Sequence, residues 1–219
     1  TQWPGTGLKG DATFDTFYAT QVESIASHEE TQKLIQNAGA QLLDKIGPAI
    51  LVTHSQAGPF GWLIADVRPD KVKGILALEP TGPPFKDAPP GKDILRPWGI
   101  ASIPLTYDPP VKDASELKIA EYPSDKPTLL VGPGTLQEQP ARQLPNLKGI
   151  PILIVSGEAS FHGNYDEWTS RYLTQAGVKN TYIRLEDEGI KSNGHMLMVE
   201  KNSLEIAEFL NKWIKKNIE

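Results

Sequence analysis

Residues Ile50 to Trp62 read ILVTHSQAGPFGW, an apolar run that ends in a turn of small residues around Ser55 and continues as an amphipathic segment. The pattern is typical of a strand-to-helix elbow that presents a nucleophilic serine. Thr53 and Ala57 occupy the two positions that are glycine in G-x-S-x-G, so the strict motif is absent. A serine that only caps the following helix is the alternative. The strand before Ser55 and the helix after it favour the nucleophile.

The sequence on both sides of this turn alternates between strand patterns and helix patterns. Residues 21–46 carry apolar side chains at helical spacing, and Gly47-Pro48 ends that helix. Four strands are predicted, at 48–54, 73–79, 151–158 and 181–187. Further helices are predicted at 60–69, 165–177 and 202–218, and a packed loop at 1–20. This alternation predicts an α/β fold with a mostly parallel sheet and helices on both faces.

The alternation stops between residues 80 and 150, a segment that is rich in proline but also contains apolar and aromatic side chains. A long irregular segment inside a compact domain is usually functional. We interpret it as a cap that covers the carboxyl ends of the strands, where open α/β sheets bind ligands. The predicted organisation is therefore core at 1–79, inserted cap at 80–150 and core again at 151–219.

Composition excludes several classes of protein. The chain has 39% hydrophobic and 22% charged residues, which is ordinary for a globular domain, and its net charge of −5 argues against a nucleic-acid partner. It has no cysteine, which excludes an internal disulfide, a thiolate nucleophile and thiolate metal ligands. No apolar run reaches the length of a membrane span. We expect neither a membrane partner nor a metal ion.

A serine nucleophile needs a base, and the base needs a group that orients it. Of four histidines, His195 lies in a turn after the last predicted strand, which agrees with the chain order serine, acid, histidine. For the acid, Glu79 ends the strand after the nucleophile helix, and Glu158 follows the strand after the cap. Composition and spacing leave both carboxylates open.

Four stretches together resemble an atypical esterase branch of the α/β-hydrolase superfamily: LVTHSQAGPF, ALEPTGPP, IPILIVSGE and GIKSNGHMLMVEKNSLEIAEFLNKWI. In that branch the acid is a glutamate before proline at the end of the strand that follows the nucleophile helix. The resemblance implies Ser55 as nucleophile, His195 as general base and Glu79 as orienting acid. It also implies the backbone N–H of Gln56 as one oxyanion donor.

The expected function is hydrolysis of a carboxylic ester or lactone through an acyl-enzyme on Ser55, with no metal or organic cofactor. Phe60, Trp98 and Tyr107 are expected to form an apolar substrate pocket. The alternatives are an amidase or a C–C bond hydrolase with the same triad, and a catalytically inactive binding subunit.

A complete member of this fold has about eight strands, and a loop after an early strand gives the second oxyanion donor. This sequence predicts four strands, with nothing resembling that loop before Ser55. A first strand without a neighbour would also be an exposed apolar edge. We therefore expect the chain to be the C-terminal part of a two-chain hydrolase, completed by a second polypeptide cut from the same precursor. A start at Thr1 rather than Met favours processing and a secreted origin.

Overall fold

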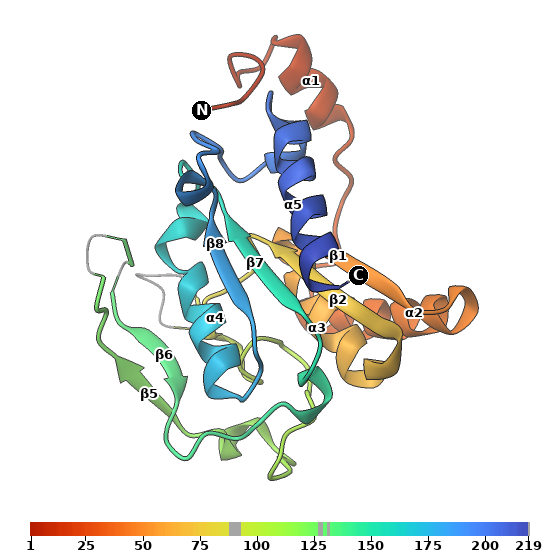
Figure 1. Ribbon diagram of the computed structural model, residues 1–219, viewed down its shortest axis with the longest axis vertical. Coiled ribbons are helices and arrows are strands. Elements are labelled where there is room, and N and C mark those ends of the chain that lie inside the picture. The colour runs from red at the N-terminus through yellow and green to blue at the C-terminus, as the bar shows by residue number, and fades with distance from the viewer. Residues whose placement is uncertain (88–92, 127–128, 131, 219) are drawn as a thin grey trace.

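The computed structural model describes residues 1–87, 93–126, 129–130 and 132–218, with a four-stranded parallel sheet at its centre (Figure 1). The strands, in spatial order, are β1 (Ala49–His54), β2 (Val72–Leu78), β7 (Ile152–Ser156) and β8 (Thr181–Arg184). All three neighbouring pairs are parallel. The predicted fold class is confirmed, as is the number of strands in the sheet.

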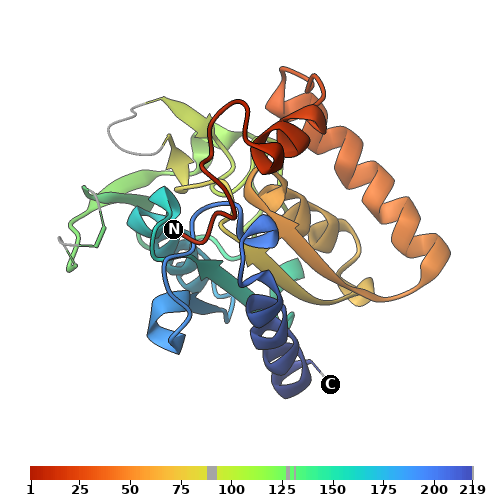
Figure 2. The same cartoon turned by 90° about the horizontal axis from the view of Figure 1, so that it is seen from above.

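Helices cover both faces of this sheet (Figures 1 and 2). On one face, α3 (Gly58–Val67) and α4 (Asp166–Gln175) share a core with the sheet, and α2 (His28–Ile46) packs against α3. On the other face, α5 (Ser203–Asn217) covers a second core formed by strands β2 and β7. No helix in the described ranges is long and apolar enough to cross a membrane.

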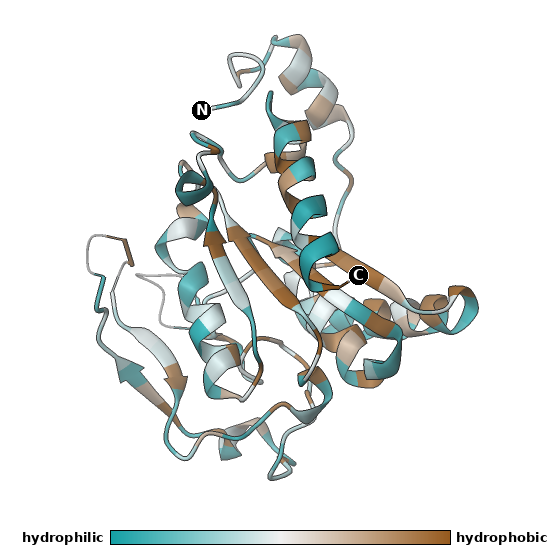
Figure 3. Cartoon of the chain, in the orientation of Figure 1, coloured by the Kyte–Doolittle hydropathy of each residue, from teal (hydrophilic) through white to brown (hydrophobic). Residues whose placement is uncertain are grey.

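Burial on both faces explains why the central strands read as continuous apolar runs. Every residue of β7 is buried, and β2 is buried except at Lys73. Figure 3 shows β1, β2 and β7 as hydrophobic, whereas the outward face of α5 is hydrophilic. β1 lies at the edge of the sheet, and its Val52 is 58% exposed.

The N-terminal region differs from the prediction of a packed loop. Residues Ala12–Ala19 form helix α1, because the side chain of Asp11 accepts hydrogen bonds from the backbone N–H groups of Thr13 and Phe14. The next helix begins at His28, where Ser27 caps Glu30, and not near residue 21. Both starts are therefore set by capping side chains and not by apolar spacing.

The segment 80–150 contains two small antiparallel sheets in an otherwise irregular path. One pairs β3 (Phe85–Lys86) with β4 (Ile94–Arg96), and the other pairs β5 (Ile119–Tyr122) with β6 (Gly134–Gln137). Residues 88–92, 127–128 and 131 of the predicted cap lie outside the described residues. Buried side chains of the segment enter the same core as α3 and α4, among them Ile100, Ile103, Leu105, Leu136 and Leu144. The division at 79/80 and 150/151 stays a prediction.

A matched pair of leucines tests this arrangement. Leu153 in β7 is 0% exposed, whereas Leu204 on α5 is 80% exposed. We expect Leu153→Ala to lower the free energy of unfolding by about 2–5 kcal/mol, because the cavity cannot fully collapse. Leu204→Ala should stay within about 0.5 kcal/mol in the same chemical denaturation experiment. Equal losses would contradict the two-faced burial of the sheet.

Candidate active site

The register of the sheet brings Ser55 and Glu79 to neighbouring positions. His54 at the end of β1 pairs with Leu78 at the end of β2, so the next residue of each strand leaves the sheet at the same edge. Both residues have left-handed backbones, with φ of 54° at Ser55 and 47° at Glu79. Such strain in non-glycine residues is typical of functional sites. The turn Ser55–Ala57 is a 3₁₀ helix that leads directly into α3.

Two glycines that follow the serine motif, Gly58 and Gly61, allow the helix to pack closely at this elbow. A Cβ atom at Gly58 would lie 2.5 Å from Cβ of Pro80, and one at Gly61 would lie 3.1 Å from Cγ2 of Ile75. Gly58 and Gly61 therefore allow α3 to lie close to β2 and the turn after it, whereas Cγ2 of Thr53 would be at ordinary contact distance, 3.5 Å, from the Cβ atom at Gly61. The backbone N–H of Thr81 donates to the carbonyl of Ser55 at 2.9 Å and ties the two turns together.

Ser55, His195 and Glu79 form a continuous hydrogen-bonded chain. Oγ of Ser55 lies 2.8 Å from Nε2 of His195, and Nδ1 of His195 lies 2.5 Å from Oε2 of Glu79. A carboxylate can only accept, so Nδ1 carries the proton and Nε2 is left to accept from the serine. A serine hydroxyl bonded to an imidazole that a carboxylate orients can lose its proton to that ring and act as a nucleophile.

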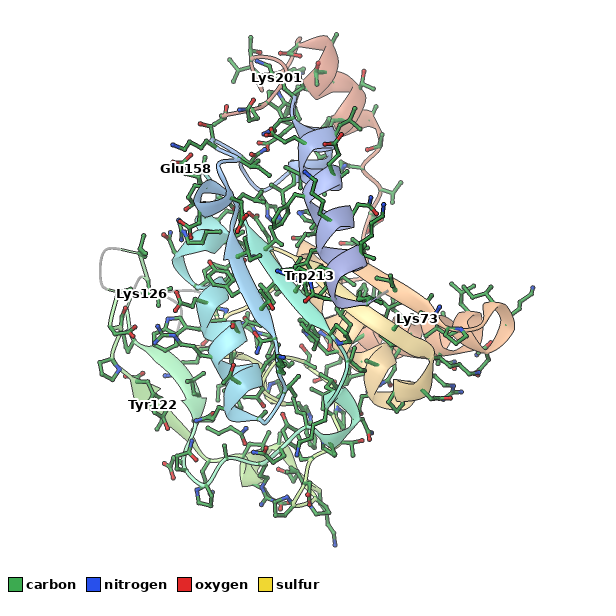
Figure 4. The ribbon with its side chains drawn as sticks, viewed as in Figure 1. Lys73, Tyr122, Lys126, Glu158, Lys201 and Trp213 are labelled. Atoms are coloured by element: carbon green, nitrogen blue, oxygen red, sulfur yellow. The ribbon has the colours of Figure 1, made fainter. Side chains whose placement is uncertain are left out.

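Glu79 is completely buried, and a buried carboxylate requires compensating donors. Besides His195, the backbone N–H of Gly157 donates to Oε1 at 2.8 Å and the hydroxyl of Ser160 donates to Oε2 at 2.7 Å. Glu158 is exposed instead and accepts from the backbone N–H of Ser192 at 2.7 Å (Figure 4). Of the two carboxylates that the sequence left open, only Glu79 contacts the histidine.

A second buried carboxylate shapes the loop that carries His195. Oε1 of Glu200 accepts from the backbone N–H of Gly194 at 2.8 Å, and Oε2 accepts from Nδ2 of Asn193 at 2.6 Å. On the outer side, the backbone of Gln2 donates to the carbonyl of Ser192 at 3.1 Å. Sequence reasoning missed these supports, although an acid shortly after NGHM was a signal that it could have used.

Two further histidines contact the ring of His195. His54 and His162 each have their ring centroid 4.5 Å from that of His195, and His162 is nearly parallel to it, at 4°. Nε2 of His54 hydrogen-bonds the carbonyl of His195 at 2.7 Å. His162 is 3% exposed with Nδ1 3.1 Å from Asp166, and burial lowers its pKa to about 4.

Ser55 and Gln56 line two cavities. One, of about 320 Å³, is bordered by residues of the segment 81–102, and the polar side chains of Thr81 and Arg96 lie in its wall. The other, of about 540 Å³, is largely apolar, and its remaining lining residues include Phe17, Ile25, Ile35, Phe60 and Met196. The structure therefore places Phe60 in the same cavity as Ser55, and its role in substrate binding stays a prediction.

Trp98 and Tyr107 line neither of these cavities. Tyr107 is 4% exposed, and its hydroxyl lies 2.8 Å from the carbonyl of Trp98 and 2.5 Å from the hydroxyl of Tyr172. Trp98 is partly buried and packs against the same core. The expectation that both side chains border the substrate is therefore not met, because they face the core under α4.

The same region offers donors for an oxyanion and atoms that could ligate a metal. The N–H of Gln56 lies at the start of the helical turn, where backbone N–H groups have no intrahelical partner. His54, Glu79 and His195 bring ligand atoms within 4.8 Å of one another. Hydrogen bonds already engage all three side chains. The arrangement fits proton transfer better than metal binding.

Over 219 residues, 99% of the chain, the sequence is 48% identical to the probable secreted lipase phiG of a fungal species (strain ATCC 74256). The chain spans 59% of the length of that relative. No family model matches the chain. This relative and the elbow described above support the resemblance to α/β-hydrolases.

Two solved structures are similar to the chain at low identity. A bacterial esterase gives a TM-score of 0.47 at 20% identity and covers 84% of this chain and 43% of its own. A monoacylglycerol lipase of Paleococcus ferrophilus gives 0.46 at 17% identity and covers 88% of this chain and 76% of its own.

Exchange of each candidate acid tests the hydrogen-bonded chain without reference to a substrate. Glu79→Gln should slow the labelling of Ser55 by a fluorophosphonate probe by roughly a hundredfold or more, because the wrong imidazole tautomer is then held. Glu158→Gln is the matched control and should change labelling little, since that carboxylate accepts from the backbone of Ser192 and not from His195. The opposite ranking would return the acid to Glu158.

Proposed function

We propose that this chain carries the catalytic centre of a carboxylic ester hydrolase, in which Ser55 attacks the carbonyl carbon of an ester or lactone. The observation that carries the proposal is the unbroken path from Oγ of Ser55 through both ring nitrogens of His195 to Glu79, with bonds of 2.8 and 2.5 Å. The name of the 48% identical relative favours an ester over an amide or a C–C bond. That relative is also named as secreted, which supports secretion of this chain.

The proposed reaction has two halves. Nε2 of His195 takes the hydroxyl proton of Ser55 as Oγ of Ser55 attacks the carbonyl carbon of the substrate. The N–H of Gln56 stabilises the oxyanion of the tetrahedral intermediate. The intermediate expels the alcohol, which receives the proton from Nε2 of His195 and leaves the acyl group on Ser55. Water then attacks this acyl-enzyme with His195 again as base, the bond between the acyl carbon and Oγ of Ser55 breaks, Oγ takes the proton back from Nε2, and the carboxylic acid leaves. Throughout, Glu79 holds Nδ1–H and stabilises the imidazolium that forms in each half.

The apolar cavity provides the place for the nonpolar part of the substrate. Phe60 at the start of α3, Ile25 before α2 and Met196 after the catalytic histidine border it together with Ser55. An ester whose carbonyl lies at Ser55 can extend its acyl or alcohol chain along these side chains. Burial of each methylene there contributes roughly 0.8 kcal/mol to binding.

We further propose that a second polypeptide completes the sheet beside β1. The edge of β1 has no neighbouring strand among the described residues, and soluble proteins avoid such apolar edges. The outward face of α2 is also apolar and exposed, at Leu34, Leu42 and Ile46. The chain spans 59% of its relative, so the remainder of such a protein is long enough to supply strands, a cover for α2 and a second oxyanion donor.

Removal of the nucleophile tests the proposed reaction. Ser55→Ala should lower kcat for a short-chain activated ester by roughly four to six powers of ten, because a covalent triad without its nucleophile keeps only its binding and oxyanion contributions. Circular dichroism should show an unchanged fold. Retention of more than about a tenth of the activity would reject the assignment.

The rates at which the parent protein hydrolyses an ester and the matched anilide distinguish an esterase from an amidase.

The completed sheet is tested by purification of the native protein and its intact mass. We expect a second polypeptide of roughly a hundred or more residues to remain bound, and activity only when both are present. Val52→Lys on the β1 edge should weaken this association. Ile94→Lys is a control of similar exposure, 55% against 58%, on β4. A 219-residue chain that is folded, monodisperse and active alone would refute the proposal.

A further inference from the structure

We propose that Ser160 is a positioning residue, whose hydroxyl fixes the carboxylate of Glu79 so that His195 is held in its reactive orientation. The inference rests on the proposed function, since it concerns the same triad. Ser160 touches none of the reacting atoms; it acts through Glu79.

The geometry couples Ser160 directly to the catalytic histidine. Its hydroxyl donates to Oε2 of Glu79 at 2.7 Å, and the same oxygen accepts from Nδ1 of His195 at 2.5 Å. The other carboxylate oxygen accepts from the backbone N–H of Gly157 at 2.8 Å. Two donors from one short loop therefore determine the plane of the carboxylate. Without the hydroxyl, only one of them remains to resist its rotation.

The hydroxyl of Ser160 can donate one hydrogen bond, and Glu79 is the acceptor. The oxygen accepts the backbone N–H of His162 at 3.2 Å, as an N-cap of the 3₁₀ turn Phe161–Asn164. The side chain is 8% exposed, so water offers little competition. The proton is therefore directed at Glu79, and the serine has a second role besides the cap.

The loop that carries Ser160 is itself fixed against the loop that carries His195. The backbone N–H of Ala159 donates to the carbonyl of Asn193 at 2.8 Å. A Cβ atom at Gly157 would lie 2.5 Å from that same carbonyl oxygen, so the two loops are in close contact. The bond between the two loops therefore gives Ser160 a fixed position from which its hydroxyl can hold Glu79 against His195.

The chain offers a matched control in Ser156. Its hydroxyl also donates at 2.7 Å to a buried carboxylate, that of Asp166, and the residue is 0% exposed. Ser156→Ala therefore removes the same kind of bond without contact to Glu79. Any cost that arises only from the loss of a buried serine–carboxylate bond should appear in both variants.

The test is a double-mutant cycle in the enzyme that contains this chain with the polypeptide that completes it. Ser160→Ala should lower kcat by roughly tenfold or more, with KM little changed, because a hydrogen bond to a charged group is lost. Ser160→Thr should restore most of the rate, and Ser156→Ala should show no comparable fall. In the Glu79→Gln background, Ser160→Ala should change kcat less than about twofold. An equal fall in both backgrounds, or none in either, would overturn the proposal.

A readout independent of turnover separates this proposal from the proposed function. The short bond between Nδ1 of His195 and Glu79 should give a far-downfield proton resonance in NMR spectra. Ser160→Ala should shift or broaden that resonance, while Ser160→Thr and Ser156→Ala keep it. If the parent protein hydrolyses no ester, the esterase assignment fails, but this shift still supports the positioning role. An unchanged resonance in Ser160→Ala, or its absence in the parent, would overturn it.

Discussion

The burial of one carboxylate organises the edge of the sheet at which Ser55, Glu79 and His195 meet. Glu79 has no exposed surface, and three donors from two separate loops satisfy it. Because those loops follow β7 and precede α5, the compensation of a single charge joins three parts of the chain that lie far apart in sequence. A buried charge without its partners is strongly destabilising. The same bonds that orient the histidine therefore also hold the ends of β2 and β7 to the loop before α5.

The sheet was predictable from sequence because its strands are buried on both faces. The continuous apolar runs that end at His54 and Leu78 predict buried strands. The pairing of these two strands then brings Ser55 and Glu79 together. The acid was not predictable in this way. Glu79 and Glu158 both follow strands, and burial and the contact with His195, which distinguish them, are tertiary properties, so the choice depended on a resemblance and not on composition.

What sequence reasoning missed depends on contacts between distant loops. His54 reaches the carbonyl of a residue 141 positions away, and a local pattern gives no sign of that partner. Tyr107 shows the opposite error, since an aromatic residue in a proline-rich segment looked like pocket lining but hydrogen-bonds within the core. Residue type indicated apolar surroundings correctly at both Phe60 and Tyr107, whereas the opening of a cavity beside Phe60 and not beside Tyr107 is a tertiary property.

The contact of Gln2 with the loop around His195 has a practical consequence for handling the protein. Its backbone N–H donates to Ser192 and its carbonyl accepts from Lys201, so the first residues brace both flanks of the catalytic loop. An affinity tag fused before Thr1 would emerge beside that loop (Figure 2). Ile218 instead packs against Gly74 near the amino end of β2, whereas Ser55 and Glu79 follow the carboxyl ends of their strands. A fusion or a surface-immobilisation linker belongs at that end of the molecule.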